Sequence, residues 1–367
     1  MAHLPDPRFA QLFRSLSYNR LVITRRFRHV NFIYKHYPDR MKLFLAVACT
    51  LSPISSSFSQ SYSDIEHLLN SRNYSKAEQI LRSKIASNAN DDSAHFFLGQ
   101  IPVRMPDPAK YDEAIDYLKR SVALKPNDPT YHHWLGRAYG VKARDAGIFS
   151  AMKYVGDVKA SFIRAVELDP KYYEARFDLI SFYLQAPGIV GGSTSKAEDV
   201  AREHEKHNTD EARLLWTQIH LYEEEFDDAE AKLFSMKKPS DRELLRNYRN
   251  LFSNLGFKYL EEDEPAKAEN IFRKFVAQFS DIAIGFHGLG RSLYDQKRFD
   301  DAIQHFEKAI ALDKTIGSQY RLGLIFESKG DKAKAIAYFE EFLAVRNNAK
   351  DKVVQEAKDK LAELKGH

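Results

Sequence analysis

The strongest constraint on the fold is a pattern that occurs twice near the end of the chain, with a period of 33 residues. Each copy has a Leu-Gly pair, a large apolar residue three positions after the glycine, then an alanine, and a phenylalanine four positions after the alanine. The glycines are Gly290 and Gly323, and the phenylalanines are Phe306 and Phe339. Self-similarity at a fixed period of this length predicts a stack of repeated helix pairs rather than a single globular core.

The residue types in this pattern have a packing explanation. A glycine within a first helix has no side chain, so a second helix can approach it closely. The alanine plays the same part on the second helix, and the phenylalanine fills the space between one repeat and the next. Because one helix pair cannot bury its apolar stripe alone, several pairs must stack. We therefore expect more copies earlier in the chain.

Diverged copies do precede the two clear ones. Gly256 lies 34 residues before Gly290, and Leu-Gly also occurs at Gly99 and Gly136. From about residue 61 to 347 the chain resembles the tetratricopeptide repeat family. The resemblance implies an all-α fold, a right-handed superhelical solenoid of about eight helix hairpins in residues 60–367. The expected repeats lie near residues 61–92, 93–128, 129–172, 173–208, 210–243, 249–282, 283–315 and 316–347.

Other segments depart from the repeat pattern. Residues 351–365 are strongly charged with apolar residues on one helical face, which predicts a C-terminal capping helix. Segments 140–156 and 185–195 are too long for standard turns between the helices of a pair, so we expect enlarged turns there. Within the first segment, we expect residues 143–154 either to add helical length or to form a flap. Pro102, with the prolines that follow it, predicts a third extended turn, because proline is disfavoured inside a helix.

The N-terminal residues have the layout of an exported bacterial protein. Residues 1–40 form a basic leader, and residues 41–59 read as a signal peptide, with Lys42, a short apolar run and small residues before the cut. The apolar run is shorter than the roughly 20 residues that span a bilayer, so we expect no integral membrane span. We predict a periplasmic or secreted protein; lipid anchoring through Cys49 and a cytoplasmic location are the alternatives.

The leader itself is unusual, because a signal peptide normally begins a protein. We hypothesise that Met41 is the native start and that residues 1–40 are not translated. The alternative is a long, disordered basic region ahead of the apolar run.

Charge excludes one class of partner. Residues 1–59 hold nine of the 55 Lys and Arg but only two of the 51 Asp and Glu, which leaves 46 basic and 49 acidic residues from 60 onward. The high isoelectric point therefore belongs to the leader. A mildly acidic body gives no support to nucleic-acid binding.

No catalytic or metal motif is present in the sequence pattern. Cys49 is the single cysteine, so the body has no thiolate metal site and no cysteine nucleophile. His204 and His207 are three residues apart, whereas a zinc protease helix has its histidines four apart. The glycine-rich segment 188–196 lacks the Gly-Lys-Ser/Thr order of a phosphate-binding loop. We predict a protein that is not an enzyme and that uses no cofactor and no metal.

The family resemblance also implies which side chains meet a partner. In tetratricopeptide proteins the first helix of each repeat lines a concave groove, and His-x-Leu-Gly-Arg occurs twice at such positions, each time with His and Arg on one helix face. Arginine suits bidentate capture of a carboxylate. The implied groove residues are His133, Arg137, Gln218, Tyr222, His287, Arg291, Tyr294 and Tyr320.

The function expected from this surface is a non-catalytic protein–protein interaction scaffold or assembly adaptor. It would bind a protein or peptide segment, acidic or C-terminal, in the concave groove. An alternative at these positions is a merely solvated polar surface. The alternative function is a small-ligand carrier or enzyme-associated module that uses the turns 140–156 and 185–195. The Asn- and Lys-based clamp of chaperone-binding family members is absent from these positions.

Overall fold

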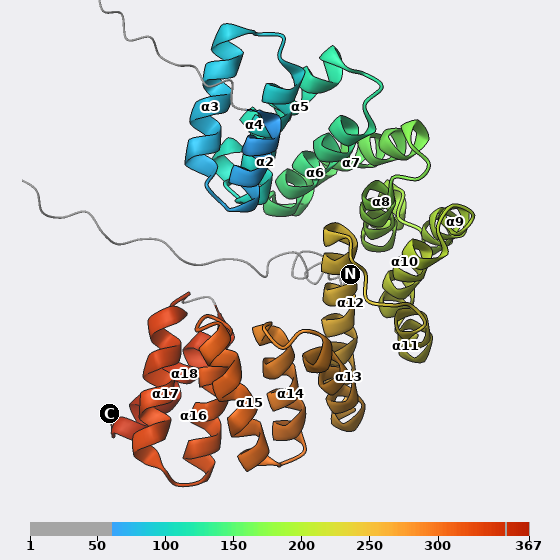
Figure 1. The fold of residues 1–367 in the computed structure, drawn as a ribbon. Helices are drawn as coiled ribbons and strands as arrows, with labels where there is room; N and C mark the ends of the chain where they lie inside the picture. The colour runs from blue at the N-terminus through green and yellow to red at the C-terminus, as the bar shows by residue number, and fades with distance from the viewer. Residues whose placement is uncertain (1–60, 349–350, 367) are drawn as a thin grey trace, which may run out of the picture. The chain divides into compact units, whose positions relative to one another are not determined.

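The computed structural model describes residues 61–348 and 351–366. The predicted leader, the signal peptide and Cys49 lie outside the described residues. Within the described ranges the chain forms 17 α-helices and two short 3-10 helices, and no strand (Figure 1). The predicted fold class, an all-α array of helix pairs, is confirmed. The right-handed sense of the superhelix stays a prediction.

The described residues form two compact units, which divide between Pro126 and Asn127. The first unit holds two helix pairs in series, and each helix packs on the next. Its helices are α2 (Tyr62–Asn70), α3 (Tyr74–Ser87), α4 (Asp92–Arg104) and α5 (Tyr111–Leu124), with the 3-10 helix η1 (Pro108–Lys110) before α5.

Six helix pairs and a terminal helix make up the second unit, again with each helix packed on its successor. Its helices are α6 (Pro129–Asp145), α7 (Ile148–Leu168), α8 (Tyr173–Gln185), α9 (Thr194–Glu205), α10 (Thr209–Tyr222), α11 (Phe226–Phe234), α12 (Arg242–Glu261), α13 (Pro265–Gln278), α14 (Ala283–Asp295), α15 (Phe299–Leu312), α16 (Ser318–Ser328), α17 (Lys332–Val345) and α18 (Lys352–Lys365). The sixth pair of the chain begins at Arg242, ahead of the expected repeat start at residue 249.

Polar residues at the starts of many first helices explain where those helices begin. Asp91 accepts a hydrogen bond from the backbone N–H of Ala94, and Asn208 and Asp241 cap α10 and α12 in the same way. Such side chains satisfy N–H groups that have no partner within the helix.

The Leu-Gly glycines have the packing role that the sequence predicts. A Cβ atom on Gly290 would lie 2.7 Å from the ring of Phe306, and one on Gly323 would lie 2.6 Å from the ring of Phe339. Both rings are fully buried. Each phenylalanine therefore packs against the glycine of its own repeat, as well as contributing to the core.

One ring spans two repeats. A Cβ on Gly256 would lie 2.6 Å from Phe272, and a Cβ on Gly288 would lie 2.2 Å from the same ring. Gly256 belongs to the first helix of the same pair and Gly288 to the first helix of the next. Phe272 thus fills the joint between α12, α13 and α14.

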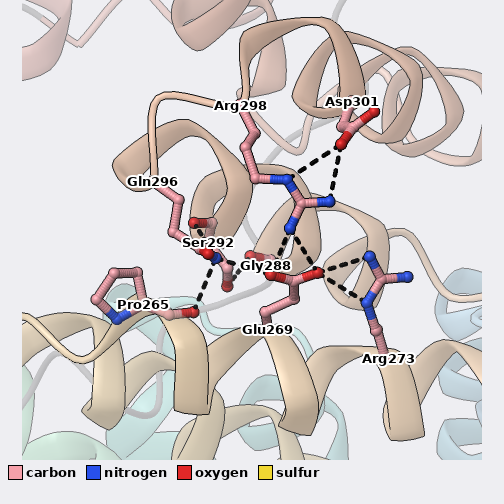
Figure 2. Close-up of polar contacts among 8 residues, drawn as sticks. All are labelled: Pro265, Glu269, Arg273, Gly288, Ser292, Gln296, Arg298 and Asp301. Carbon is pink, nitrogen blue, oxygen red and sulfur yellow. Dashed lines mark hydrogen bonds and ion pairs between the residues drawn. The ribbon is translucent and has the colours of Figure 1, made fainter.

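A polar network reinforces the following joint (Figure 2). Glu269 on α13 accepts hydrogen bonds from Arg273 on its own helix, from Gln296 after α14, and from Arg298 before α15. Arg298 also donates to Asp301. These arginines each face a carboxylate of the chain itself, so this side of the repeats is internally charge-matched.

Two of the three segments expected as extended turns have different outcomes. Segment 140–156 contains no long loop: α6 continues to Asp145 and α7 begins at Ile148, so of the two expected alternatives it is the added helical length that the structure shows. The third extended turn is present between α4 and α5 and contains η1, but the place expected for Pro102 was wrong. Pro102 lies inside α4 and is buried, and the helix continues past it to Arg104. It is only two residues from the helix end, so the loss of one backbone hydrogen bond is tolerated there.

The segment between α8 and α9 does form an extended turn. It contains the 3-10 helix η2 (Gly188–Val190) and Gly191, whose φ of 102° is available to glycine without strain. Ser193 then caps α9 by accepting a hydrogen bond from the N–H of Lys196. The turn is closed by backbone and cap contacts.

The last helix, α18, packs against α17 and buries Val354 and Ala357. Lys360 of α18 pairs with Glu327 at 2.9 Å, and Lys365 pairs with Glu340 at 2.6 Å. None of the helices across the described ranges combines the length and the apolar character that crossing a bilayer would need.

Candidate functional site

The first helices of successive pairs form a row in the second unit. Helix α10 contacts both α8 and α12, and α12 contacts α14. Side chains bridge the remaining steps, from α6 to α8 and from α14 to α16. These first helices are α6, α8, α10, α12, α14 and α16. We call the surface that they form together the first-helix face. Every groove residue predicted from the sequence lies on one of these helices.

At the α6 end the predicted histidine is buried. His133 is 2% exposed, and its two ring nitrogens are both engaged. Its Nδ1 lies 2.8 Å from the hydroxyl of Tyr172 and its Nε2 lies 2.8 Å from Oδ2 of Asp178. Burial lowers the pKa of His133, although the neighbouring Asp178 carboxylate opposes that shift. His133 therefore serves the packing of α6 on α8 and presents no free nitrogen to a partner.

The matching arginine is also occupied by this chain. Nε of Arg137 lies 3.6 Å from Asp178, and its guanidinium group stacks over Trp134 at 4.5 Å. Burial tends to raise the pKa of Asp178, but the His133 hydrogen bond and the charge of Arg137 outweigh it and hold the pKa below its ordinary value. A carboxylate from a partner would have to compete with Asp178 for Arg137. The sequence pattern did not reveal Asp178, which lies on another repeat.

Helix α10 contributes one polar bridge and one exposed aromatic residue. Nε2 of Gln218 donates to the hydroxyl of Ser181 on α8 at 2.5 Å, and within the described ranges its buried Oε1 has no hydrogen-bond partner. Tyr222 at the end of α10 is 49% exposed, which is high for a large aromatic side chain. Tyr222 can give a partner apolar contact area at little entropic cost.

At the α14 end the second histidine is held differently. Nδ1 of His287 lies 2.8 Å from the hydroxyl of Ser318 on α16. Burial lowers the pKa of His287 to about 3, and the positive charges of Arg321, Arg291 and Arg346 add to that shift. The ring is thus neutral at physiological pH. The charge at this end of the face is carried by arginines.

Sequence reasoning missed two of those arginines. Arg321 follows Tyr320 on α16, and Arg346 caps the C-terminal end of α17. Neither is among the groove residues that the family resemblance implies. The only available indication was their identity as arginines close to a Leu-Gly pair and to the end of a second helix.

Tyrosines surround the charge. The Arg321 guanidinium group lies 5.3 Å from the ring centre of Tyr294 and 5.8 Å from that of Tyr320. Tyr294 is partly exposed, whereas Tyr320 is only 6% exposed and packs against Phe342. Of the predicted groove residues at this end, Arg291 and Tyr294 are accessible, and Tyr320 belongs to the core.

An acidic hollow of about 280 Å³ lies at the N-terminal ends of α8, α10 and α12 and was not predicted. Its carboxylates include Glu174, Glu211 and Asp241, with Lys171 at its edge. Burial raises the pKa of Glu174, and the neighbouring carboxylates add to that effect. Glu211 is 2.6 Å from Nε2 of the buried His204, so part of this charge is used within the fold.

Potential metal donors approach one another at the end of α10. Ligand atoms of His220, Glu225 and Asp228 lie within 4.8 Å of one another. Nδ1 of His220 is already 2.7 Å from a Glu225 oxygen, and both carboxylates are exposed. The trio is a surface ion-pair group. His204 and His207, whose spacing was compared with a zinc helix, instead pack ring to ring at 6.3 Å.

Comparison with known proteins agrees with the repeat architecture. A model of the family described as tetratricopeptide repeat matches residues 281–348, which include both clear copies of the sequence pattern. Residues 281–348 therefore consist of tetratricopeptide repeats. No curated protein matches the sequence.

One solved structure supports the same fold over most of the chain. The structure of yeast Tom70 is similar with a TM-score of 0.58 and 15% sequence identity, over 80% of this chain and 59% of that chain. Two weaker matches are Pseudomonas aeruginosa pilF, with a TM-score of 0.43 and 13% identity over 74% of this chain and all of that one, and the Cut9–Hcn1 complex of the APC/C, with a TM-score of 0.43 and 14% identity over 79% of this chain. This chain spans about half the length of its counterpart in that complex.

Proposed function

We propose that this tetratricopeptide repeat protein is a non-catalytic interaction scaffold or assembly adaptor that binds a peptide segment of a partner along the first-helix face of its second unit. Tetratricopeptide repeat proteins typically mediate protein–protein interaction. The observation that carries the proposal is the exposure of Tyr222 and the partial exposure of Tyr294 on the same row of first helices, together with partly exposed arginines.

The physical basis is that tyrosine and arginine side chains along the row supply different contacts. Tyrosine rings offer rigid contact area and a hydroxyl group, which suits recognition of an irregular peptide. Arg291, which is 31% exposed, adds a positive charge beside Tyr294. Because the row is assembled from several repeats, a peptide can contact residues that are distant in sequence without any enclosed cavity.

Site-specific photocrosslinking tests this proposal. A photoreactive phenylalanine analogue would replace Tyr222 or Tyr294 in separate variants, and Lys308 on α15 in a control variant. Lys308 is exposed but belongs to a second helix. The proposal expects one partner band from the two first-helix positions and none from the control. Equal capture at all three positions, or capture only at Lys308, would refute the use of this face.

We also propose that residues 41–59 direct export and are removed before Gln60. The support is the charge, apolar run and small residues of that segment. N-terminal sequencing of the mature native protein tests it, since a mature chain that begins well before Gln60 would contradict the cleavage.

A further inference from the structure

Three arginines lie at the α14–α17 end of the first-helix face. They are Arg291 on α14, Arg321 on α16 and Arg346 at the end of α17. They are brought together by short links. The hydroxyl of Ser318 on α16 bonds His287 on α14, and the guanidinium carbon of Arg346 lies 3.6 Å from where a Cβ of Gly317, the residue before Ser318, would stand.

The acids around this cluster are engaged elsewhere or shared. Asp295 is 3.8 Å from Arg291. Glu327 is paired with Lys360, and Glu356 acts on the hydroxyl of Tyr320. Over the described ranges no ion pair joins Arg321 or Arg346 to any carboxylate of the chain.

Two other arginine sites of the second unit, both already described, differ from this one. On the second-helix side, Arg273 and Arg298 both donate to Glu269 (Figure 2). At the α6 end of the face, Arg137 has Asp178. Leaving two partly buried guanidinium groups without a carboxylate is unfavourable in a free chain, and an incoming carboxylate would relieve that cost.

The geometry also gives the arginines a defined position. The guanidinium group of Arg321 lies against the rings of Tyr294 and Tyr320, so its donors are restricted in direction. Pre-positioned arginines bind carboxylates with two parallel hydrogen bonds and lose little side-chain entropy on binding. The neutral ring of His287 leaves the charge of the site to the arginines.

We infer that Arg321 and Arg346, with Arg291, form an anion site that binds the Asp and Glu side chains of an acidic peptide segment. This rests on the proposed function and names the chemistry that the site selects. The acidic hollow near α8 and α12 would repel the same segment, which orients it toward the α16 end of the face.

Fluorescence anisotropy with the full chain tests the inference. The probe is a short labelled peptide of alternating Asp and Glu with an amidated C-terminus, compared with the same peptide in Asn and Gln. We expect the acidic peptide to bind at least about tenfold more tightly than its amide counterpart, and the double variant Arg321→Gln, Arg346→Gln to lose that difference. The single variant Arg346→Gln, which leaves the tyrosine stack intact, should lose part of it.

The control variant is Arg298→Gln, which changes net charge by the same amount as Arg346→Gln but on the second-helix side. It should bind the acidic peptide within about twofold of wild type. Equal losses in the two single variants would mean non-specific charge attraction and would overturn the site. If binding instead requires a free C-terminus on the Asn and Gln peptide, the site recognises a terminal carboxylate and not Asp or Glu side chains. That result would also overturn the inference.

Failure of this inference is distinguishable from failure of the proposed function. If the acidic peptide does not bind but Tyr222 and Tyr294 still crosslink to a partner, the face is used and the acidic specificity is wrong. If crosslinking fails while the peptide binds at Arg321 and Arg346, the anion site stands and the extended peptide path is wrong.

Discussion

Replacing Gly288 by alanine tests whether the joint between two repeats is as tightly packed as the structure shows. A Cβ at this position would lie 2.2 Å from two carbons of the Phe272 ring and 2.5 Å from a third. The ring is fully buried, and a Cβ on Gly256 would also lie 2.6 Å from it. Because glycines on both neighbouring first helices contact this ring, it cannot move away from one without approaching the other.

The expected magnitude is a balance of two effects. Alanine in place of glycine within a helix is favourable by about 1 kcal/mol. Overpacking a core costs about 1–3 kcal/mol, and the confinement of Phe272 places this case near the upper end of that range. The net prediction for Gly288→Ala is therefore a destabilisation of about 2 kcal/mol.

Urea unfolding followed by far-UV circular dichroism measures this, with Gly140→Ala as the matched control. Gly140 is also helical, but no atom lies within 4 Å of its would-be Cβ, so the same substitution should stabilise the protein by up to about 1 kcal/mol. A Phe272→Leu background should remove most of the Gly288→Ala penalty, because the smaller side chain leaves room for the added methyl group. If Gly288→Ala behaves like Gly140→Ala, or if its penalty persists unchanged in the Phe272→Leu background, the packing argument is wrong.

Three further predictions concern charge. Burial tends to raise the pKa of Glu269, but hydrogen bonds from amide and guanidinium donors outweigh that effect and hold the pKa below its ordinary value. Glu269→Gln should therefore lower the free energy of unfolding by about 1 kcal/mol at pH 7. In urea titrations at a series of pH values, the difference from wild type should vanish as pH falls through that lowered pKa. His287 should titrate near pH 3 by NMR. In the unfolded chain this histidine binds a proton below about pH 6.5, so the free energy of unfolding should decrease as pH is lowered from about 6.5 toward 3, by up to about 1.4 kcal/mol per pH unit. The variant His287→Gln should remove this dependence. Asp178→Ala should cost about 2 kcal/mol in urea unfolding while leaving the photocrosslinks at the α14 end unchanged; loss of those crosslinks would contradict a local structural role.

Much of the fold was predictable because repeat packing leaves a local pattern in the sequence. The Leu-Gly pairs at Gly290 and Gly323 mark positions where helices come too close for a side chain, and the phenylalanines that fill the gap follow at fixed spacing. Each such contact lies within one repeat, so period and residue type suffice to predict it. Turns such as 140–156 were less predictable, because a longer helix and a longer loop use similar residues.

The candidate site depended on contacts that cross repeats. The sequence placed His133 and Arg137 on one helix face, yet it could not show that Asp178, from the next repeat, occupies both. Nor could it show that Arg321 and Arg346 approach the α14 end of the face, where neither forms an ion pair with a carboxylate of residues 61–348 or 351–366. Pairing between side chains on different repeats depends on how far one helix pair is rotated and shifted against the next, and a helical period does not specify that. The sequence alone thus determined the repeated helix pairs and their glycine–aromatic cores, and only the tertiary structure decided which polar groups of the face are paired with other groups of the described residues.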